Sequence, residues 1–331
     1  MGDGEKADVA PALKGVYKLN NEHRKLFMTK IKNYLSLIKF SHTIFAMPFA
    51  LVGFFLAIFK SDFAFSVLPG WHSLIFPPEF IKEMIFKLIL VVLCMVFARS
   101  AAMAFNRYLD RSFDAANPRT AIREIPKGII AVNGALIFTI VSSLLFVVCS
   151  YFINTLCFAL SPIALFVVLF YSYTKRFTPL CHLVLGVGLS LAPIGSYLAV
   201  TGVFAPLPLL FSFAVIFWVS GFDIIYALQD EQFDKEHKLY SIPAWLGKKK
   251  ALTVSRIFHA ISALFILAAG LHGDFQWLYW LGFSVFAGML IYQQSLVKPN
   301  DLSRVNLAFM TANGIASIAF GILVISDMLI R

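Results

Sequence analysis

Charged residues are scarce in this sequence of 331 residues: they make up 14% of it, whereas hydrophobic residues make up 59%. The mean hydropathy of +0.79 lies well above the range of soluble domains. This shortage of charge excludes an ordinary soluble globular domain. We therefore expect an all-α polytopic membrane protein embedded in the lipid bilayer, because a spanning helix satisfies its own backbone hydrogen bonds.

Two further absences narrow the class of protein. The four cysteines never occur in a CxxC spacing, which argues against a zinc site or a disulfide framework. No apolar run follows a short basic start, so a cleavable signal peptide is not expected. Residues 1–35 are predicted to form a cytoplasmic tail, and residues 36–331 a single transmembrane domain.

The net charge of +10 would suggest a nucleic-acid partner if the protein were soluble. Here the basic residues gather in short loops between apolar segments, where they set membrane topology. We therefore expect no nucleic-acid partner and no obligatory protein partner.

Long apolar runs dominate the rest of the chain. About 20 apolar residues cross a bilayer as one helix. Nine segments fit this requirement: 38–59, 83–108, 129–152, 155–173, 180–201, 207–227, 251–271, 277–297 and 306–329. The predicted fold is thus a bundle of nine transmembrane helices.

Loop charges predict the orientation of this bundle. Lysine and arginine precede the first span and follow the second, fourth, sixth and eighth, whereas the connections near residues 153, 204 and 274 contain none. The positive-inside rule then places the N-terminus in the cytoplasm and the C-terminus outside. Lys60 and Lys82, in the first outer loop, depart from the pattern. We expect a multi-pass protein of a bacterial inner membrane, with the active site on its cytoplasmic side.

The most informative residues lie where the second span ends. Asn106, Asp110 and Asp114 are four residues apart, so a helix would place their oxygens on one face. Oxygen ligands in such numbers suit Mg²⁺, which typically bridges one or two carboxylates to substrate phosphates. Arg99 lies seven residues before Asn106 on the same predicted face, where its guanidinium would bind a phosphate oxygen or, alternatively, pair with one of the carboxylates.

A second acidic segment follows the sixth span. Asp223, Asp230 and Asp234 are spaced by seven and four residues, again on one face of a helix. Acidic residues at a helix end are often no more than solvated. Two such sets, each beside several cations, favour one metal–diphosphate site instead, because carboxylates and diphosphate repel each other unless cations intervene. The basic residues available for this are Arg119, Arg123, Lys127 and Lys175.

These segments also carry a resemblance to a known family. NxxxDxxxD at residues 106–114 is followed by NPRTAIREIP, and DxxYAxQDxxxD at residues 223–234 is followed by SIP. Together with YSYTKRFTPL after the fourth span, these motifs resemble the signature regions of the UbiA superfamily of membrane prenyltransferases. The resemblance extends over nearly the whole chain from about residue 33.

The resemblance implies a helical bundle around a cavity that faces the cytoplasm, where two Mg²⁺ ions hold a polyprenyl diphosphate. Asn106, Asp110 and Asp114 would bind one ion, and Asp230 and Asp234 the other. Tyr171 and Lys175 match a pair that contacts the diphosphate in the family. Arg99, Arg119 and Arg123 are assigned to the diphosphate as well.

The implied reaction is transfer of the polyprenyl group to a ring carbon of an aromatic hydroxy acid in quinone biosynthesis. Metal and cations stabilise charge on the departing diphosphate, so Asp110 and Asp230 are counted as catalytic. Asp223 is our candidate for orienting or deprotonating the acceptor; the alternative is that it only supports Asp230. His182, His259 and His272 are interpreted as structural.

The acceptor is less sharply indicated. KFSHTIFAMPFA at residues 39–50, with RTAIREIP, resembles the subgroup that makes menaquinone by the futalosine route and uses 1,4-dihydroxy-6-naphthoate; 4-hydroxybenzoate, the acceptor in ubiquinone synthesis, is the other candidate. Lys39 and His42 are placed at the acceptor carboxylate; alternatively, Lys39 only reaches to the membrane interface and His42 forms a hydrogen bond at a helix end. Other UbiA-type acceptors (haem, chlorophyllide or a glycerolipid) and, from another class, a cation-coupled transporter are the alternatives.

Overall fold

The described part of the chain is almost entirely helical. A computed structural model describes residues 29, 31–38, 45–61 and 76–330. Within these residues the only β-structure is an isolated bridge between Lys298 and Asp301. The predicted all-α class is therefore confirmed. The predicted N-terminal tail lies mostly outside the described residues.

The helices follow the predicted spans closely. In chain order they are α2 (Met47–Phe59), α4 (Pro78–Leu109), α5 (Arg111–Ala116), α6 (Val132–Ile153), α7 (Thr155–Thr174), α8 (Cys181–Thr201), α9 (Pro206–Ala227), the 3₁₀-helix η2 (Leu228–Asp230), α10 (Glu231–Glu236), α11 (Ile242–His272), α12 (Trp277–Leu296), the π-helix η3 (Leu307–Ala312) and α13 (Asn313–Ile330).

Every predicted span coincides with a helix, but two of these helices are not both long enough and apolar enough to cross a membrane by themselves. Among the described residues, 7 helical segments are long and apolar enough to cross a membrane. Helix α2 has only 13 described residues, and α12 is not among the seven. The protein is therefore an integral membrane protein, while the count of nine crossings stays a prediction.

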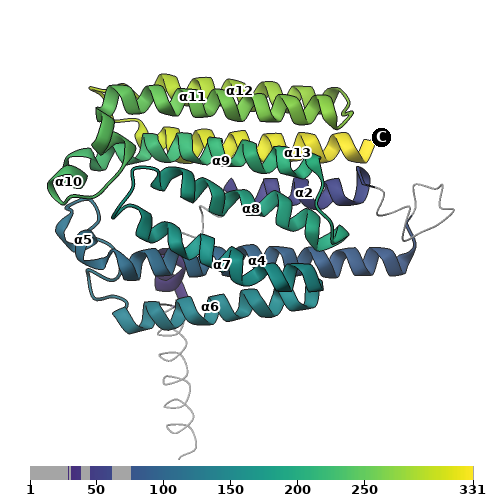
Figure 1. The fold of residues 1–331 in the computed structure, drawn as a ribbon, viewed down its shortest axis with the longest axis horizontal. Coiled ribbons are helices and arrows are strands. Elements are labelled where there is room, and N and C mark those ends of the chain that lie inside the picture. Colours follow the sequence, from purple (N-terminus) through teal and green to yellow (C-terminus); the bar gives the residue numbers. More distant parts are fainter. Residues whose placement is uncertain (1–28, 30, 39–44, 62–75, 331) are drawn as a thin grey trace, which may run out of the picture.

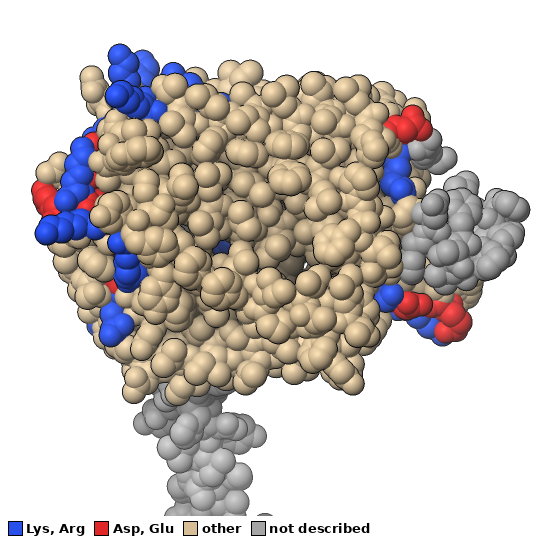
Figure 2. Space-filling model, in the orientation of Figure 1, with Lys and Arg blue, Asp and Glu red and all other residues tan. Residues whose placement is uncertain are grey.

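The long helices lie side by side in one bundle (Figure 1). The short helices α5 and α10 meet at one end of it, hereafter the polar end, and the C-terminus lies at the opposite end. Uncharged residues cover the broad face between the ends, and most lysine, arginine, aspartate and glutamate side chains gather at the polar end (Figure 2). This distribution suits a bundle whose flank faces lipid and whose ends face water.

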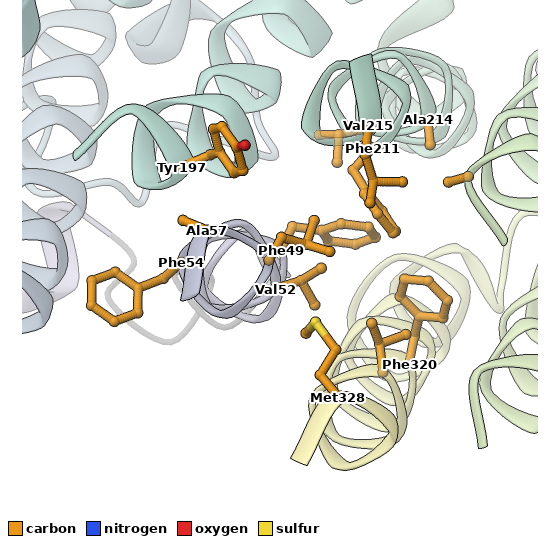
Figure 3. Close-up of a cluster of buried hydrophobic side chains, with 14 of the residues drawn as sticks. Phe49, Val52, Phe54, Ala57, Tyr197, Phe211, Ala214, Val215, Phe320 and Met328 are labelled. Carbon is orange, nitrogen blue, oxygen red and sulfur yellow. The ribbon is translucent and has the colours of Figure 1, made fainter. Parts of the chain in front are cut away.

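Helix α2 forms the centre of the bundle. Its Phe49 and Phe54 are almost fully buried, and Phe49 packs against α9 and α13 (Figure 3). Gly53 permits close approach to α8, because a Cβ there would lie 2.1 Å from the carbonyl oxygen of Pro193. Small residues at helix contacts are typical of membrane bundles, in which packing replaces the hydrophobic effect.

Candidate active site

Each acidic segment spans the boundary between two helices. Helix α4 ends at Leu109, Asp110 has φ −90° and ψ 8°, and α5 then begins at Arg111. The second segment passes from α9 through the 3₁₀-helix η2, which contains Asp230, into α10. Backbone hydrogen bonds from Asp110 N to Asn106 O and from Asp114 N to Asp110 O keep the predicted helical spacing of the first set, whereas a 3₁₀ turn interrupts the second. The two short helices α5 and α10 lie at the polar end (Figure 1).

Arg119 joins the two segments, although it lies 111 residues before Asp230. Its Nε donates to Asp230 Oδ1 at 2.9 Å, its Nη2 pairs with Asp230 Oδ2, and its Nη1 donates to the Tyr226 hydroxyl at 3.1 Å. Asn117 Nδ2 also donates to Asp230 Oδ1, at 3.0 Å. A bidentate guanidinium pair with an added hydrogen bond fixes the carboxylate firmly. The prediction that both segments form one site is thereby supported by direct contacts.

The carboxylates of the first segment are likewise paired with cations, one of them from the loop after α7. Arg176 Nη2 lies 2.8 Å from Asp110 Oδ1, and Asn106 Nδ2 donates to the other oxygen of Asp110 at 3.0 Å. Arg123 Nη1 lies 2.5 Å from Asp114 Oδ1. Burial raises the pKa of the Asp110 carboxyl above its ordinary value, although Arg176 opposes that shift.

The second segment contains a comparable pair at Asp234, which is fully buried. Lys175 Nζ lies 2.8 Å from its Oδ1, and the Ser241 hydroxyl donates to its Oδ2 at 2.8 Å. Burial alone would lower the pKa of Lys175, but the Asp234 carboxylate raises it above its ordinary value. Lys175 is therefore held as a cation at the site.

The donor set suits Mg²⁺ better than a softer metal. The predicted ligands offer only carboxylate and amide oxygens, and Asp114 Oδ2 is buried without a hydrogen-bond partner among the described residues. No group of three or more histidine, cysteine, aspartate or glutamate side chains in the described part of the chain could hold a metal by itself. Two carboxylates per ion, completed by substrate phosphate and water, match the usual coordination of Mg²⁺.

Asp223 has a partner that the sequence did not suggest. His182, on α8, places Nδ1 2.7 Å from Asp223 Oδ2, and the backbone N–H of Ile242 donates to His182 Nε2 at 3.3 Å. Because Nε2 accepts, Nδ1 carries the proton that is donated to Asp223. His182 is therefore not the isolated residue that was predicted, but is hydrogen-bonded to a candidate catalytic carboxylate.

An apolar cavity of about 380 Å³ lies within the bundle. Arg99 and Tyr171 line it near the polar end, and α4, α6, α7 and α8 supply its apolar walls. The face shown in Figure 2 is hollowed near its middle, where α7 and α8 lie in Figure 1. Lys175 follows Tyr171 by one helical turn, so the apolar space adjoins the charged cluster.

Sequence reasoning missed several contributors to the site. Arg176, Asn117 and Ser241 each bind a predicted carboxylate. All three lie within the segments that carry the family resemblance, and this position could have identified them as site residues. Lys39 and His42 lie outside the described residues, and their predicted role at the acceptor stays a prediction.

Comparison with known proteins adds an independent line of evidence. A family model described as the UbiA prenyltransferase family matches residues 46–315. A 4-hydroxybenzoate octaprenyltransferase of Aliivibrio fischeri is 30% identical over 261 residues, which are 76% of this chain and 84% of that protein. A 4-hydroxybenzoate octaprenyltransferase of Francisella tularensis is 27% identical over 241 residues, covering 72% of this chain and 84% of that protein.

Solved structures share the architecture. The apo structure of a UbiA homolog from Aeropyrum pernix K1 aligns with a TM-score of 0.70 at 29% identity, covering 87% of this chain and 97% of that one. A UbiA homolog from Archaeoglobus fulgidus, bound to GPP and Mg2+, aligns with a TM-score of 0.61 at 20% identity, covering 89% of this chain and 99% of that one. At 20% identity, the similarity to the Archaeoglobus fulgidus homolog shows a shared fold and nothing finer.

Proposed function

Since this chain belongs to the UbiA prenyltransferase family and is a prenyl transferase, we propose that its reaction joins a polyprenyl group to a ring carbon of an aromatic hydroxy acid in quinone biosynthesis. The observation that carries this proposal is the junction of two features. An apolar cavity, suited to an isoprenoid tail, adjoins a cluster of carboxylates and cations, suited to a metal-bound diphosphate.

Mg²⁺ is the proposed cofactor, with two ions. The Archaeoglobus fulgidus homolog binds GPP and Mg2+, and the oxygen-only donor set of this chain fits the same metal. Asn106, Asp110 and Asp114 would hold one ion, and Asp230 and Asp234 the other. When bound, the ions would supply Lewis-acid stabilisation of the charge that builds on the leaving diphosphate.

The side chains around the carboxylates have complementary tasks in this proposal. Arg99, Arg119, Arg123 and Lys175 hold the diphosphate oxygens, and Tyr171 donates a hydrogen bond at the mouth of the cavity. In the structure, Arg119, Arg123 and Lys175 are paired with carboxylates. A diphosphate that binds would attract the same cations and so compete with those carboxylates. Departure of the diphosphate leaves an allylic cation on the prenyl group. The apolar wall of the cavity keeps water away from this cation, which water would otherwise capture.

Asp223 is proposed to accept the proton of the acceptor. Hydrogen bonding to His182 occupies its Oδ2, so Oδ1 is the oxygen directed to the acceptor. Its side chain is 25% exposed, whereas that of His182 is 3% exposed, so the carboxylate is the accessible member of the pair. Such an orientation by a neighbouring group is typical of catalytic bases.

Substitution of His182 tests this arrangement. The amide nitrogen of asparagine lies close to the position of histidine Nδ1, whereas that of glutamine lies close to Nε2. We expect H182N to keep most of the transfer rate and H182Q to lose about tenfold in kcat, the scale typical of a lost orienting contact. Rates at saturating donor and acceptor, measured on stably folded variants, check this. Equal rates in H182N and H182Q would contradict the orienting role.

The acceptor is an aromatic acid, either 1,4-dihydroxy-6-naphthoate or 4-hydroxybenzoate. The relatives named above support the second, and the KFSHTIFAMPFA segment supports the first. Purified protein offered Mg²⁺, a polyprenyl diphosphate and both acids in one reaction would show which acid appears in the product. Product from neither acid would contradict the proposed acceptor class.

The proposal also includes the orientation of the protein. Lysine and arginine gather at the polar end, so that end is assigned to the cytoplasm, with the C-terminus outside.

A further inference from the structure

Arg107, in the last turn of α4, is a buried cation without a partner among the described residues. Its relative exposure is 6%, and its Nε is buried without a hydrogen bond to any of them. No ion pair joins Arg107 to a carboxylate in the described part of the chain. A buried charge without a partner is among the costliest features that a protein retains.

Four of the other site cations are paired, whereas Arg99, like Arg107, has a buried Nε without a hydrogen-bond partner among the described residues. Arg119, Arg123, Lys175 and Arg176 each pair with one carboxylate of the acidic segments. Arg107 lies near enough to Arg123 to be repelled by it and to Asp114 and Glu124 to be attracted, but it forms an ion pair with neither carboxylate. The Oδ1 atom of Asp114, however, is already paired with Arg123, and its Oδ2, which has no hydrogen-bond partner among the described residues, is the oxygen proposed for Mg²⁺. Arg107 is therefore available to an anion that the acidic segments do not supply.

The surroundings of Arg107 identify the chemistry of that anion. Arg107 lies in the neighbourhood of Tyr171, which lines the apolar cavity, and of Asp114, a proposed Mg²⁺ ligand. The group that must reach from the mouth of the cavity to the metal is the diphosphate of the prenyl donor. An aromatic acid does not have to extend from the cavity to the metal, because its ring only has to reach the prenyl carbon that carries the diphosphate.

We propose that Arg107 is a substrate-binding residue that holds a phosphate oxygen of the prenyl diphosphate between Tyr171 and Asp114. This inference deepens the proposed function and rests on it. The planar guanidinium offers two parallel donors to a phosphate, which lysine cannot do. The diphosphate in turn neutralises the charge of Arg107 and relieves its repulsion by Arg123.

Binding of inorganic pyrophosphate to the purified full chain in detergent, with Mg²⁺, tests the inference without turnover. We expect R107Q to weaken pyrophosphate binding at least tenfold and R107K to weaken it less, while 4-hydroxybenzoate binding changes by less than twofold. R111Q is the matched control, because Arg111 lies one turn away, is exposed and donates only to the carbonyl oxygen of Tyr108 among the described residues. This control should bind pyrophosphate as the unaltered protein does.

Three results would contradict the inference, and they are distinguishable. Unchanged pyrophosphate binding in R107Q would refute the role of Arg107 alone. A loss confined to the aromatic acid would move Arg107 to the acceptor. Failure of the unaltered protein to bind pyrophosphate with Mg²⁺ would refute the proposed function as well.

Thermal unfolding separates this role from a structural one. Removal of an unpaired buried charge is expected to leave the midpoint of unfolding of the ligand-free protein unchanged or to raise it. If Arg107 were only structural, R107Q would lower the midpoint of unfolding and would leave the affinity for pyrophosphate unchanged. If R107Q does not fold, the comparison of R107K with the unaltered protein decides the question, because equal affinities would then refute the inference.

Discussion

Replacement of Asp230 by alanine is expected to abolish prenyl transfer, and replacement of Asp110 should do the same from the other acidic segment. Asp230 is held by Arg119 and Asn117, and Asp110 by Arg176 and Asn106, so each carboxylate sits at the centre of its half of the site. Loss of one group that stabilises developing charge typically costs about 10²–10³ in rate. Loss of a metal ligand here also weakens metal binding, so we expect a loss of about 10³ or more.

Glu236 offers a matched control for these variants. It lies on α10, two residues after Asp234, but it is exposed and, within the described residues, hydrogen-bonded only to Gln232. E236A should therefore transfer prenyl groups at the rate of the unaltered protein. Steady-state rates should be compared in protein that elutes as a single species and has an unchanged midpoint of thermal unfolding. Retained activity in both D110A and D230A would refute the two-ion assignment.

A leucine at Gly195 is expected to change which donors the protein accepts. Gly195 lines the apolar cavity on the half of α8 that lies away from the polar end, and a Cβ built there meets no atom within 4 Å. The larger side chain would therefore extend into the cavity without disturbing the helix contacts. We expect kcat/KM for a long polyprenyl diphosphate to fall about tenfold or more, which corresponds to about 1.4 kcal/mol of lost transition-state binding. The value for geranyl diphosphate should stay within twofold.

Gly288 provides the control for that experiment. A Cβ built at Gly288 likewise meets no atom within 4 Å, but this residue lies on α12 and does not line the cavity. G288L should leave the preference for chain length unchanged. An equal loss for both donors in G195L, or no loss for the long one, would show that this cavity does not hold the prenyl chain.

Much of the fold was accessible from the sequence because the membrane makes hydropathy so informative. Carboxylates stand out in a chain with 14% charged residues, so Asp110, Asp114, Asp230 and Asp234 were found by spacing alone. The cations Arg119, Arg123 and Lys175 were found as their neighbours, and the structure pairs each of them with one of those carboxylates.

The rest depended on contacts that periodicity does not encode. His182 and Asp223 are 41 residues apart on neighbouring helices, so neither residue signals the other in the sequence. The breaks at Asp110 and at Leu228–Asp230 use residues that a continuous helix also accepts, and a single 3₁₀ turn leaves little trace in composition. Arg107 was not singled out from the sequence, because only its burial and its lack of a hydrogen-bond partner in the described part of the chain distinguish it.

One measurement tests the central claim most directly: formation of a ring-carbon-prenylated aromatic acid by the purified protein, followed by mass spectrometry with Mg²⁺, with EDTA, and with Mg²⁺ restored in excess. The two acidic segments predict a prenylated product with Mg²⁺, its loss on chelation and its recovery afterwards. Equal product with and without EDTA would contradict the account, because carboxylates clustered around a diphosphate require metal cations to bind it.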